Sequence, residues 1–364
     1  MNAGAASERS IAVTVLIATH NRASRLRKTL EALLAQQTPA SLGWEILVAD
    51  NGSTDDTIEV FRTMAMRAEG RLRYVFEPRL GKSRALNAGI AVARGAVIAM
   101  TDDDASPAVD WVAAAAVVLD KWCVDGAGGR IRPRWEAEPP SWLLESPRLL
   151  DCLALMEYDR PATMPVPAGK YPQVWGANMV CRRAALQALG GFDVNLGPVG
   201  GRRFCNEDVD IVRRMLQSGR AVAYDPGLAV FHRIPRARMR RAYFRRVMWD
   251  MGEGVARAAA APPSGPRILG IPRWRIRFMA RMAVHSSVRT LARRPGAFYE
   301  MLDCVYAAGV AWGQLKRTVR ERRARSARAA ASWPSRSRRA RTAIVGSEPA
   351  VNAVAGAVDS RTMS

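Results

Sequence analysis

The sequence lacks any run of eighteen uncharged apolar residues, although 49% of its 364 residues are hydrophobic. A helix that crosses a bilayer needs about 20 predominantly apolar residues, so the sequence does not predict a spanning segment. The apolar run 11–18 follows Glu8 and Arg9 and continues into Thr19-His20-Asn21-Arg22 without a small-residue cleavage site. It therefore predicts a first buried strand rather than a signal peptide.

Cysteine is scarce, and its spacing forms no motif. The five cysteines are Cys123, Cys152, Cys181, Cys205 and Cys304, and no C-x-x-C pair occurs. An odd number of scattered cysteines argues against a disulfide framework and against a zinc site. It fits a reducing compartment.

Acidic residues are few beside the basic ones: 33 Asp and Glu against 55 Lys and Arg, a formal net charge of +22. The excess is uneven. Arg236–Arg246 contains six arginines and no acid, and Lys316–Arg341 contains eleven basic residues and one acid. Such clustering predicts a polyanionic partner, either anionic lipid or nucleic acid.

The first hundred residues alternate strand and helix patterns. Strands are predicted at 11–18, 44–49, 72–76 and 96–100, and helices at 25–36, 54–67 and 83–93. Repeated βα units build a mostly parallel sheet with helices on both faces, and ligands bind at the carboxyl ends of its strands. The polar clusters after three of these strands are therefore expected to converge.

The sharpest of these clusters is Asp102-Asp103-Asp104, which follows the fourth predicted strand. Adjacent carboxylates repel one another, and a divalent cation shared with substrate phosphates would offset that repulsion. The alternative is that Asp103, Asp104 and Ser106 only precede and cap a helix over 107–121.

Two further clusters point to the same edge. Asp50 and Asn51 end the second predicted strand, where a simple turn with a helix cap is the alternative. Lys82 and Arg84 begin the third helix, where cations oppose the helix dipole. A bound diphosphate would remove that conflict, and ordinary surface placement is the alternative.

Later in the chain, Asn206-Glu207-Asp208 begins a predicted helix over 206–218, and two strands are predicted at 221–224 and 228–231. Acids in a first helical turn commonly complement the dipole. The functional interpretation makes one of them a general base. His232 follows the second of these strands and is either structural or a metal ligand.

The remaining segments carry less information. Residues 130–175 are rich in proline and tryptophan. They form either a pocket for an acceptor substrate or a surface insertion. Arg236–Met251 and Phe298–Leu315 predict amphipathic helices that either lie on an anionic membrane or cover the catalytic domain. We divide the chain into a disordered N-terminus (1–10), a catalytic domain (11–235), a helical, basic membrane-proximal region (236–320) and a disordered Arg/Ala/Ser-rich tail (321–364).

Taken in order, the motifs from Ile11 to His232 resemble the family 2 glycosyltransferases, which have a GT-A fold. They are Val15-Leu16-Ile17-Ala18-Thr19-His20-Asn21-Arg22, Asp50-Asn51-Gly52-Ser53-Thr54-Asp55, Gly81-Lys82-Ser83-Arg84-Ala85-Leu86-Asn87-Ala88-Gly89, Thr101-Asp102-Asp103-Asp104, Trp175-Gly176-Ala177-Asn178, Gly190-Gly191-Phe192-Asp193 and Glu207-Asp208-Val209-Asp210.

The resemblance implies a role for each matching position. The residues expected to hold the nucleotide sugar are Ala18, His20, Arg22, Asp50, Asn51, Lys82, Arg84, Asp102 and Asp103. Asp104, with His232, would bind a divalent metal. Asp208 would deprotonate the acceptor hydroxyl, and Glu207 would shape the same pocket. Trp175, Gly176 and Asn178 would line the acceptor pocket.

The implied activity is inverting, metal-dependent sugar transfer with Mn²⁺ or Mg²⁺ as cofactor. A UDP-sugar is the favoured donor, and a glycan or lipid-linked molecule is the acceptor, as in cell-surface glycan or polysaccharide synthesis. The basic helices and tail add an anionic membrane surface as partner, which places the chain at the cytoplasmic face of a membrane.

Three rival classes explain less of the sequence. A sugar nucleotidyltransferase should have a glycine-rich loop after its first strand, where this chain has Thr19-His20-Asn21-Arg22. A nucleic-acid-binding protein would explain the charge but not the acidic clusters, and the tail has only Trp333 for stacking. A non-catalytic glycan- or nucleotide-binding relative of the same fold is the third alternative.

Overall fold

The structure is a computed structural model that describes residues 10–158, 162–164, 174–200, 206–259, 265–292, 294 and 296–331. The predicted disordered ends at 1–9 and 332–364 therefore lie outside the described residues. The chain divides into two units, Met1–Thr318 and Val319–Ser364. Everything described below up to Thr318 belongs to the first unit.

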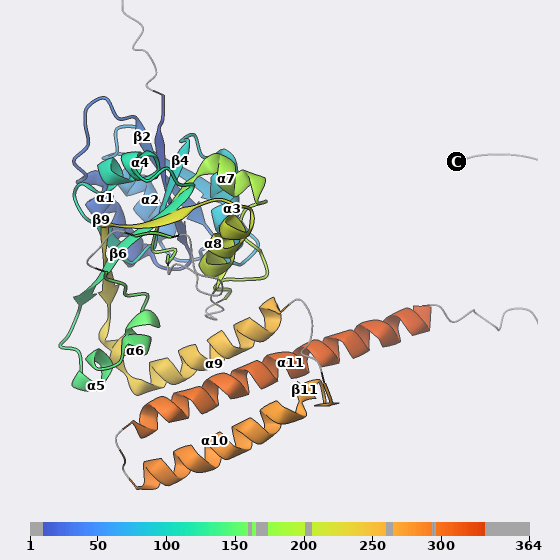
Figure 1. Ribbon diagram of the computed structural model, residues 1–364. Coiled ribbons are helices and arrows are strands. Elements are labelled where there is room, and N and C mark those ends of the chain that lie inside the picture. The colour runs from blue at the N-terminus through green and yellow to red at the C-terminus, as the bar shows by residue number, and fades with distance from the viewer. Residues whose placement is uncertain are drawn as a thin grey trace, which may run out of the picture. The chain divides into compact units, whose positions relative to one another are not determined.

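The first third of the chain folds as predicted, into parallel strands joined by helices (Figure 1). Strands β1 to β4 pair in parallel in the order β3-β2-β1-β4. Their bounds are Val13–Thr19, Trp44–Asp50, Leu72–Phe76 and Val97–Thr101, and the connecting helices are α1 (Ala23–Leu34), α2 (Thr57–Ala65) and α3 (Lys82–Val92).

Alternation along β1 places a hydrophobic core on each face of the sheet. Val15 and Ile17 face the cluster that contains Leu26 and Leu30 of α1, whereas Leu16 faces the cluster that contains Leu86 of α3. All six side chains are buried. Because successive strand residues point to opposite faces, one apolar strand supports helices on both sides of the sheet.

The second half of the sheet is mixed, in the order β4-β8-β6-β9-β5, with β7 beside β9. Strands β4–β8, β8–β6, β9–β5 and β7–β9 pair antiparallel, and β6–β9 pairs parallel. The elements are β5 (Ala105–Pro107), α4 (Trp111–Lys121), β6 (Gly126–Trp135), α5 (Ser141–Leu144), α6 (Pro147–Asp151), β7 (Ala162–Met164), β8 (Asn178–Arg182), α7 (Arg183–Ala188), α8 (Glu207–Gln217) and β9 (Val222–Ile234).

Two sequence predictions change here. The segment 130–175, interpreted from the sequence as an acceptor pocket or a surface insertion, contains regular structure, because β6 extends to Trp135 and α5, α6 and β7 follow it. The two strands predicted at 221–224 and 228–231 form the single strand β9, which passes through Pro226-Gly227 without ending. The predicted α/β fold class, a large curled sheet with flanking helices followed by C-terminal helices, is confirmed.

The C-terminal elements of the first unit are largely helical. They are η1 (Arg236–Met239), α9 (Arg241–Ala258), β10 (Arg267–Ile268), β11 (Ile271–Pro272), α10 (Arg273–Leu291) and α11, which spans Ala297–Ala331 and continues into the second unit. Helices α9 and α11 cross at glycines. A Cβ on Gly252 would lie 2.2 Å from the Tyr306 carbonyl oxygen, and one on Gly309 would lie 2.3 Å from that of Trp249.

Several apolar side chains of α9 and α11 are buried. Phe244, Met248 and Leu302 belong to the hydrophobic cluster that also holds α1 and α4. These three side chains therefore pack against the α/β domain, whereas Trp312 of α11 is 42% exposed. Among the helices in the described ranges, none is long and apolar enough to cross a membrane.

In the second unit, α11 remains helical to Ala331. This differs from the predicted disorder that begins at residue 321. Alanine and arginine are among the strongest helix formers, so an Arg/Ala-rich segment can continue a helix without a packed face. Low sequence periodicity alone is therefore a poor guide to disorder here.

Candidate functional site

Most of the predicted site residues line one pocket of about 530 Å³ at the carboxyl ends of β1, β2 and β4. Ligands in open α/β sheets bind at this edge. The predicted residues found there are Ala18, His20, Arg22, Asn51, Lys82, Asp102, Asp103, Asp104, Trp175, Glu207, Asp208 and His232.

Four predicted residues do not line this pocket. Asn178 is 0% exposed, accepts a hydrogen bond from Trp111 Nε1 at 2.8 Å and donates to two backbone carbonyls, so it is a structural residue rather than an acceptor contact. Asp50 is buried and accepts from the Tyr74 hydroxyl. Arg84 and Gly176 are also absent from the lining, although Gly176 supports the site through its backbone.

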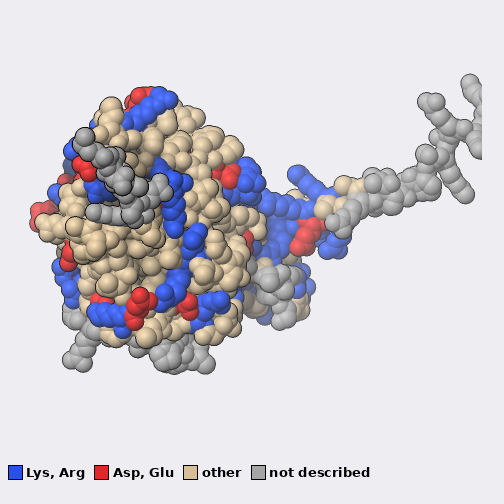
Figure 2. Space-filling view, turned by 90° about the horizontal axis from the view of Figure 1, so that it is seen from above, with Lys and Arg blue, Asp and Glu red and all other residues tan. Residues whose placement is uncertain are grey.

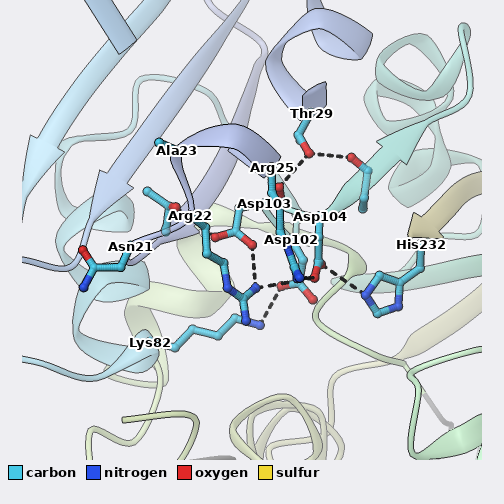
Figure 3. Close-up of polar contacts among 12 residues, drawn as sticks. Asn21, Arg22, Ala23, Arg25, Thr29, Lys82, Asp102, Asp103, Asp104 and His232 are labelled. Atoms are coloured by element: carbon cyan, nitrogen blue, oxygen red, sulfur yellow. Dashed lines mark hydrogen bonds and ion pairs between the residues drawn. The ribbon is translucent and has the colours of Figure 1, made fainter. Parts of the chain in front are cut away.

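The acidic triplet forms a turn between β4 and β5, and its carboxylates pair with cationic side chains from other parts of the chain (Figure 3). Asp102 Oδ1 lies 2.8 Å from Lys82 Nζ, and Asp103 Oδ1 lies 2.7 Å from Arg22 Nη1. The helix-cap alternative fails, since α4 begins only at Trp111 and has no side-chain cap.

Helix α1 and strand β1 hold this turn in place. The Thr29 hydroxyl lies 2.9 Å from the carbonyl oxygen of Asp103 and 2.7 Å from that of Ala105. The Thr19 hydroxyl donates to Asp103 Oδ2 at 2.9 Å. Since Asp103 and Asp104 are 3% and 2% exposed, the turn presents buried charges that need partners.

Asp104 has the densest set of cationic neighbours. Its Oδ2 lies 2.7 Å from Arg238 Nη2 and 3.0 Å from Arg25 Nη1, and its Oδ1 lies 3.1 Å from His232 Nε2. Burial alone would raise the pKa of Asp104, but His232, Arg238 and Arg22 outweigh it and hold that pKa well below the ordinary value. The carboxylate is therefore ionised at neutral pH.

The imidazole of His232 is oriented as a metal ligand would be. Its Nδ1 lies 2.9 Å from the carbonyl oxygen of Leu153, which can only accept, so Nδ1 carries a proton. In the protonated ring, Nε2–H donates to Asp104 Oδ1 and its charge lowers the pKa of Asp104. In the neutral ring, Nε2 turns its lone pair toward Asp104 Oδ1, and two facing acceptors need a positive species between or beside them. Arg238 Nη1, 3.1 Å from Nε2, is such a species in this structure.

The same two atoms fit a divalent cation. A metal-bound histidine commonly donates its other ring N–H to a backbone carbonyl, as His232 does. Within the described ranges, no three His, Cys, Asp or Glu side chains converge as a complete ligand set. A Mg²⁺-type site needs only one or two carboxylates when substrate phosphates supply the remaining oxygens.

Asn51 is tied to the loop before α3 and positions Lys82. Its Nδ2 donates to the carbonyls of Glu77 and Arg79, and its Oδ1 accepts from the Gly81 N–H at 2.6 Å. Gly81 has a φ of 139°, which L side chains rarely adopt. This geometry places Lys82 at the first position of α3, with its ammonium group 3.4 Å from Glu207 Oε1.

Glu207 and Asp208 begin α8 and face the same pocket. Asp208 Oδ2 accepts from the Gly176 N–H at 3.0 Å, and Oδ1 accepts from the Val209 N–H at 2.9 Å. Burial raises the pKa of Asp208. Burial and the neighbouring Asp208 raise the pKa of Glu207 to about 7, against the opposing effect of Lys82. Carboxylates with raised pKa values in a cleft are candidates for proton transfer.

Sequence reasoning missed several residues of the pocket. Arg238 belongs to an arginine run that the sequence assigns to anionic partners, and nothing in its local pattern marks it as a partner of Asp104. Arg25, which pairs with Asp104 but does not line the pocket, is predicted from the sequence only as the start of a helix. Tyr243, Met248 and Tyr306, from α9 and α11, also line the pocket.

Comparison with known proteins gives a family for part of the chain. The family described as glycosyl transferase family 2 matches residues 14–190. Glycosyltransferase AglE of Haloferax volcanii is 33% identical over 119 residues, which are 33% of this chain and 39% of that protein. The pre-mycofactocin glycosyltransferase of Mycobacterium tuberculosis is 27% identical over 230 residues, 60% of this chain and 42% of that protein.

The chain thus spans less than half of the length of these two relatives. Among solved structures, a mannosyltransferase from Pyrobaculum calidifontis in complex with GDP-Man and Mn²⁺ is similar to the chain with a TM-score of 0.49 and 21% identity. That similarity covers 88% of this chain and 75% of the mannosyltransferase.

Proposed function

Residues 14–190 form a domain of the family 2 glycosyltransferases, and from that premise we propose that the chain transfers a sugar from a nucleoside-diphosphate donor to an acceptor hydroxyl. The observation that carries the proposal is the convergence of Asp102–Asp104, Lys82 and Asp208 in one pocket. These side chains come from three separate parts of the chain. Their meeting supplies both charge for a diphosphate and a carboxylate for proton transfer.

The donor half of the pocket has cations of its own for the phosphates. Lys82, Arg22 and Arg238 all line it, and each is paired with an acid of the Asp102–Asp104 turn. An incoming diphosphate can take over these ion pairs, because phosphate oxygens accept from Lys and Arg as carboxylates do. The Lys82 ammonium remains charged for this role, since Asp102 and Glu207 outweigh burial and raise its pKa.

The proposed reaction is a single displacement. Asp208 accepts the proton of the acceptor hydroxyl, whose oxygen bonds to the anomeric carbon as the bond from that carbon to the diphosphate oxygen breaks. The anomeric configuration is inverted, and the nucleoside diphosphate leaves with the electron pair. Glu207 lies beside Asp208 and keeps Lys82 directed at the pocket. The Gly176 N–H orients the Asp208 carboxylate.

Asp104 and His232 are the residues that would hold a divalent cation, Mn²⁺ or Mg²⁺. A bound cation supplies positive charge to the departing diphosphate. Arg238 contacts both Asp104 and His232 in this structure. We therefore expect the contacts of Arg238 to change when donor and cation bind.

The donor class can be tested by thermal stabilisation. We expect UDP, and not GDP, dTDP or CMP, to raise the unfolding temperature, and to do so more strongly with Mn²⁺ than with a chelator, because ligand binding to the folded state stabilises it. Stabilisation by another nucleotide would change the donor assignment. No stabilisation by any nucleotide, with or without Mn²⁺, would contradict the proposed function.

We also propose that the chain acts at the cytoplasmic face of a membrane, in cell-surface glycan or polysaccharide synthesis, with a glycan or lipid-linked acceptor. Support comes from α10, a different helix from those the sequence indicated. It contains five arginines and no acid. Its exposed apolar side chains are Trp274, Phe278, Val284, Val288 and Leu291.

A helix with exposed aromatic and aliphatic side chains between arginines fits the interface of an anionic bilayer. The chain as a whole is basic, with 55 Lys and Arg against 33 Asp and Glu, and blue Lys and Arg side chains are spread over the face shown in Figure 2. The partner proposed for this helix is anionic lipid.

Flotation with vesicles tests this surface. We expect the protein to float with vesicles that contain phosphatidylglycerol and to remain behind with phosphatidylcholine alone. Val284→Asp should lower the floated fraction several-fold, because it places a negative charge on an apolar face beside anionic lipid. Val117→Asp, at an equally exposed valine of α4, is the matched control. If both variants floated equally, α10 would not be the helix that contacts the vesicles.

A further inference from the structure

The pocket extends beyond the charged donor half to an apolar wall. We call this wall the apolar annex, and it consists of Leu153, Tyr243, Val247, Met248, Met251 and Tyr306, all of which line the same pocket as Asp208 and Trp175. None of the six carries a formal charge. The donor half, in contrast, is lined by Arg22, Lys82 and the acidic turn.

The annex is firmly built. Val247 and Met248 are 3% and 1% exposed although they line a pocket. Tyr306 is held against α9 at Gly252, where any side chain would collide with the Tyr306 backbone. Lys316 on α11 pairs with the buried Glu253 of α9 at 2.9 Å. The wall is thus a fixed part of the helix pair rather than a loosely placed surface.

Two contacts, one through Leu153 and one through Arg238, connect the annex to the donor half of the pocket. Leu153 lines the pocket, and its carbonyl oxygen accepts from His232 Nδ1. The guanidinium of Arg238 pairs with Asp104. Arg238 lies in η1, which leads directly into α9. A ligand that extends from Asp208 into the annex therefore lies along a continuous path.

The phosphates, ribose and sugar of a nucleoside-diphosphate sugar are polar and gain little from an apolar wall, and its base has its expected place at the strand ends, where Ala18, His20 and Asn51 line the pocket. The wall is therefore assigned to the second substrate, the acceptor. We infer that the acceptor carries an apolar group near its reactive hydroxyl and that the apolar annex binds this group. The inference rests on the proposed function, since it needs Asp208 to face the acceptor. It narrows the acceptor class to hydroxyl compounds with an alkyl, isoprenoid or similar apolar substituent.

Charged groups at the border of the annex do not alter this assignment. Arg148 and Asp151 line the pocket as well. Arg148 is paired with Asp303 of α11 and lies 3.7 Å from Met248 Sδ through Nη2. Its charge is therefore already compensated, and its position marks the polar rim of the apolar wall.

Matched pairs of simple glycosides test the inference by binding rather than by turnover. Methyl and hexyl β-glucoside, galactoside and N-acetylglucosaminide are titrated calorimetrically into the full chain with UDP and Mn²⁺ present, below the concentrations at which the hexyl compounds aggregate. Each fully buried methylene contributes roughly fourfold in affinity. The hexyl member of at least one pair should therefore bind roughly tenfold or more tightly than its methyl partner.

Filling the annex should abolish this preference. Val247→Trp is expected to reduce hexyl binding to the methyl level and to leave UDP binding unchanged. Val255→Trp, at an exposed valine eight residues further along α9, is the control and should retain the preference. If Val247→Trp fails to fold, the half-buried Met251→Gln, which replaces a thioether by an amide of similar length, should lower the preference in the same direction.

The outcomes separate the two proposals. UDP binding with equal affinity for methyl and hexyl members of every pair would overturn the annex and leave the proposed function standing. No binding of any nucleotide would overturn the proposed function and the annex with it. A geranyl glycoside that binds more tightly than the hexyl compound would identify the apolar group as isoprenoid, and the reverse order would identify it as a plain alkyl chain. Either order supports the annex.

Discussion

Asp208→Asn is expected to lower kcat by about 10²–10⁴-fold while leaving nucleotide binding near that of the unmodified protein. Asparagine has the same shape, and its amide oxygen can still accept the 3.0 Å hydrogen bond from the Gly176 N–H. It cannot take a proton from an acceptor hydroxyl. Transfer rate and UDP affinity, measured on the same preparation, provide the test.

Asp210→Asn is the matched control for this variant. Asp210 lies one half-turn further along α8, is paired with Arg214 at 2.7 Å and does not line the pocket. It should retain transfer. Full activity in Asp208→Asn would remove Asp208 as the base. If Glu207→Gln then caused the larger loss, the base would be Glu207, whose pKa of about 7 also suits proton transfer.

The pH dependence follows from the same burial. Because burial raises the pKa of Asp208 above its ordinary value of 3.8, a base at this position becomes protonated at a higher pH than an exposed aspartate. The transfer rate should therefore fall on acidification above the range in which ordinary aspartates titrate. Asp208→Asn should lack this acidic limb.

Asp104→Asn is expected to abolish the part of the nucleotide-induced stabilisation that depends on Mn²⁺. The substitution removes the carboxylate charge that lies 3.1 Å from His232 Nε2, and a neutral amide is a much weaker ligand for a divalent cation. At a ligand concentration 100 times Kd the whole stabilisation by the ligand is about 3 kcal/mol, and the variant should lose the Mn²⁺-dependent part of it. Unfolding temperatures measured with UDP, with and without Mn²⁺, report it directly.

The same substitution also removes the ion partner of Arg25 and Arg238, so its stability without ligand must be measured first. Asp104→Glu keeps the charge and should keep part of the Mn²⁺ effect. Asp110→Asn, at an exposed aspartate before α4, should behave as the unmodified protein. A full Mn²⁺-dependent shift in Asp104→Asn would show that the cation binds elsewhere.

Much of the fold was predictable because local patterns agree with tertiary structure in the first hundred residues. The apolar strands β1, β2 and β4 each end in polar residues, and the rule that such ends share one edge of a sheet brought Asn51, Lys82 and the acidic turn together correctly. The rule cannot tell which side chain at a strand end faces the pocket and which one faces the protein interior. Asp50 and Asn51 are adjacent, yet only Asn51 lines the pocket.

The second half of the sheet was less predictable, because its strands violate the usual compositional preferences. Strand β6 has the sequence GAGGRIRPRW, with three glycines and a proline, residues that are depleted in strands. Its glycines permit close contacts: a Cβ on Gly129 would lie 2.0 Å from the Leu228 carbonyl oxygen of β9. Such a constraint comes from a partner a hundred residues away, and no local window contains it.

Arg238 and Asn178 show the same limit at the site. Arg238 was grouped with its arginine neighbours, and only the fold brings it 2.7 Å from Asp104. Asn178 lies in a matching motif but bonds Trp111 and two backbone carbonyls, so its amide serves the fold. Sequence alone gives residue types and order. Whether a polar side chain meets a ligand or another part of the protein depends on contacts across the whole chain.

The central claim is that one pocket brings a diphosphate-binding charge cluster to a base that activates an acceptor hydroxyl. Phosphorus NMR of UDP-, GDP- and dTDP-sugars, each incubated with the protein, Mn²⁺ and the hexyl glycosides, tests it most directly. The account predicts release of free nucleoside diphosphate together with a new glycoside from at least one donor, and no release with Asp208→Asn. Every donor remaining intact with the unmodified protein, or release that is equally fast with Asp208→Asn, would contradict it.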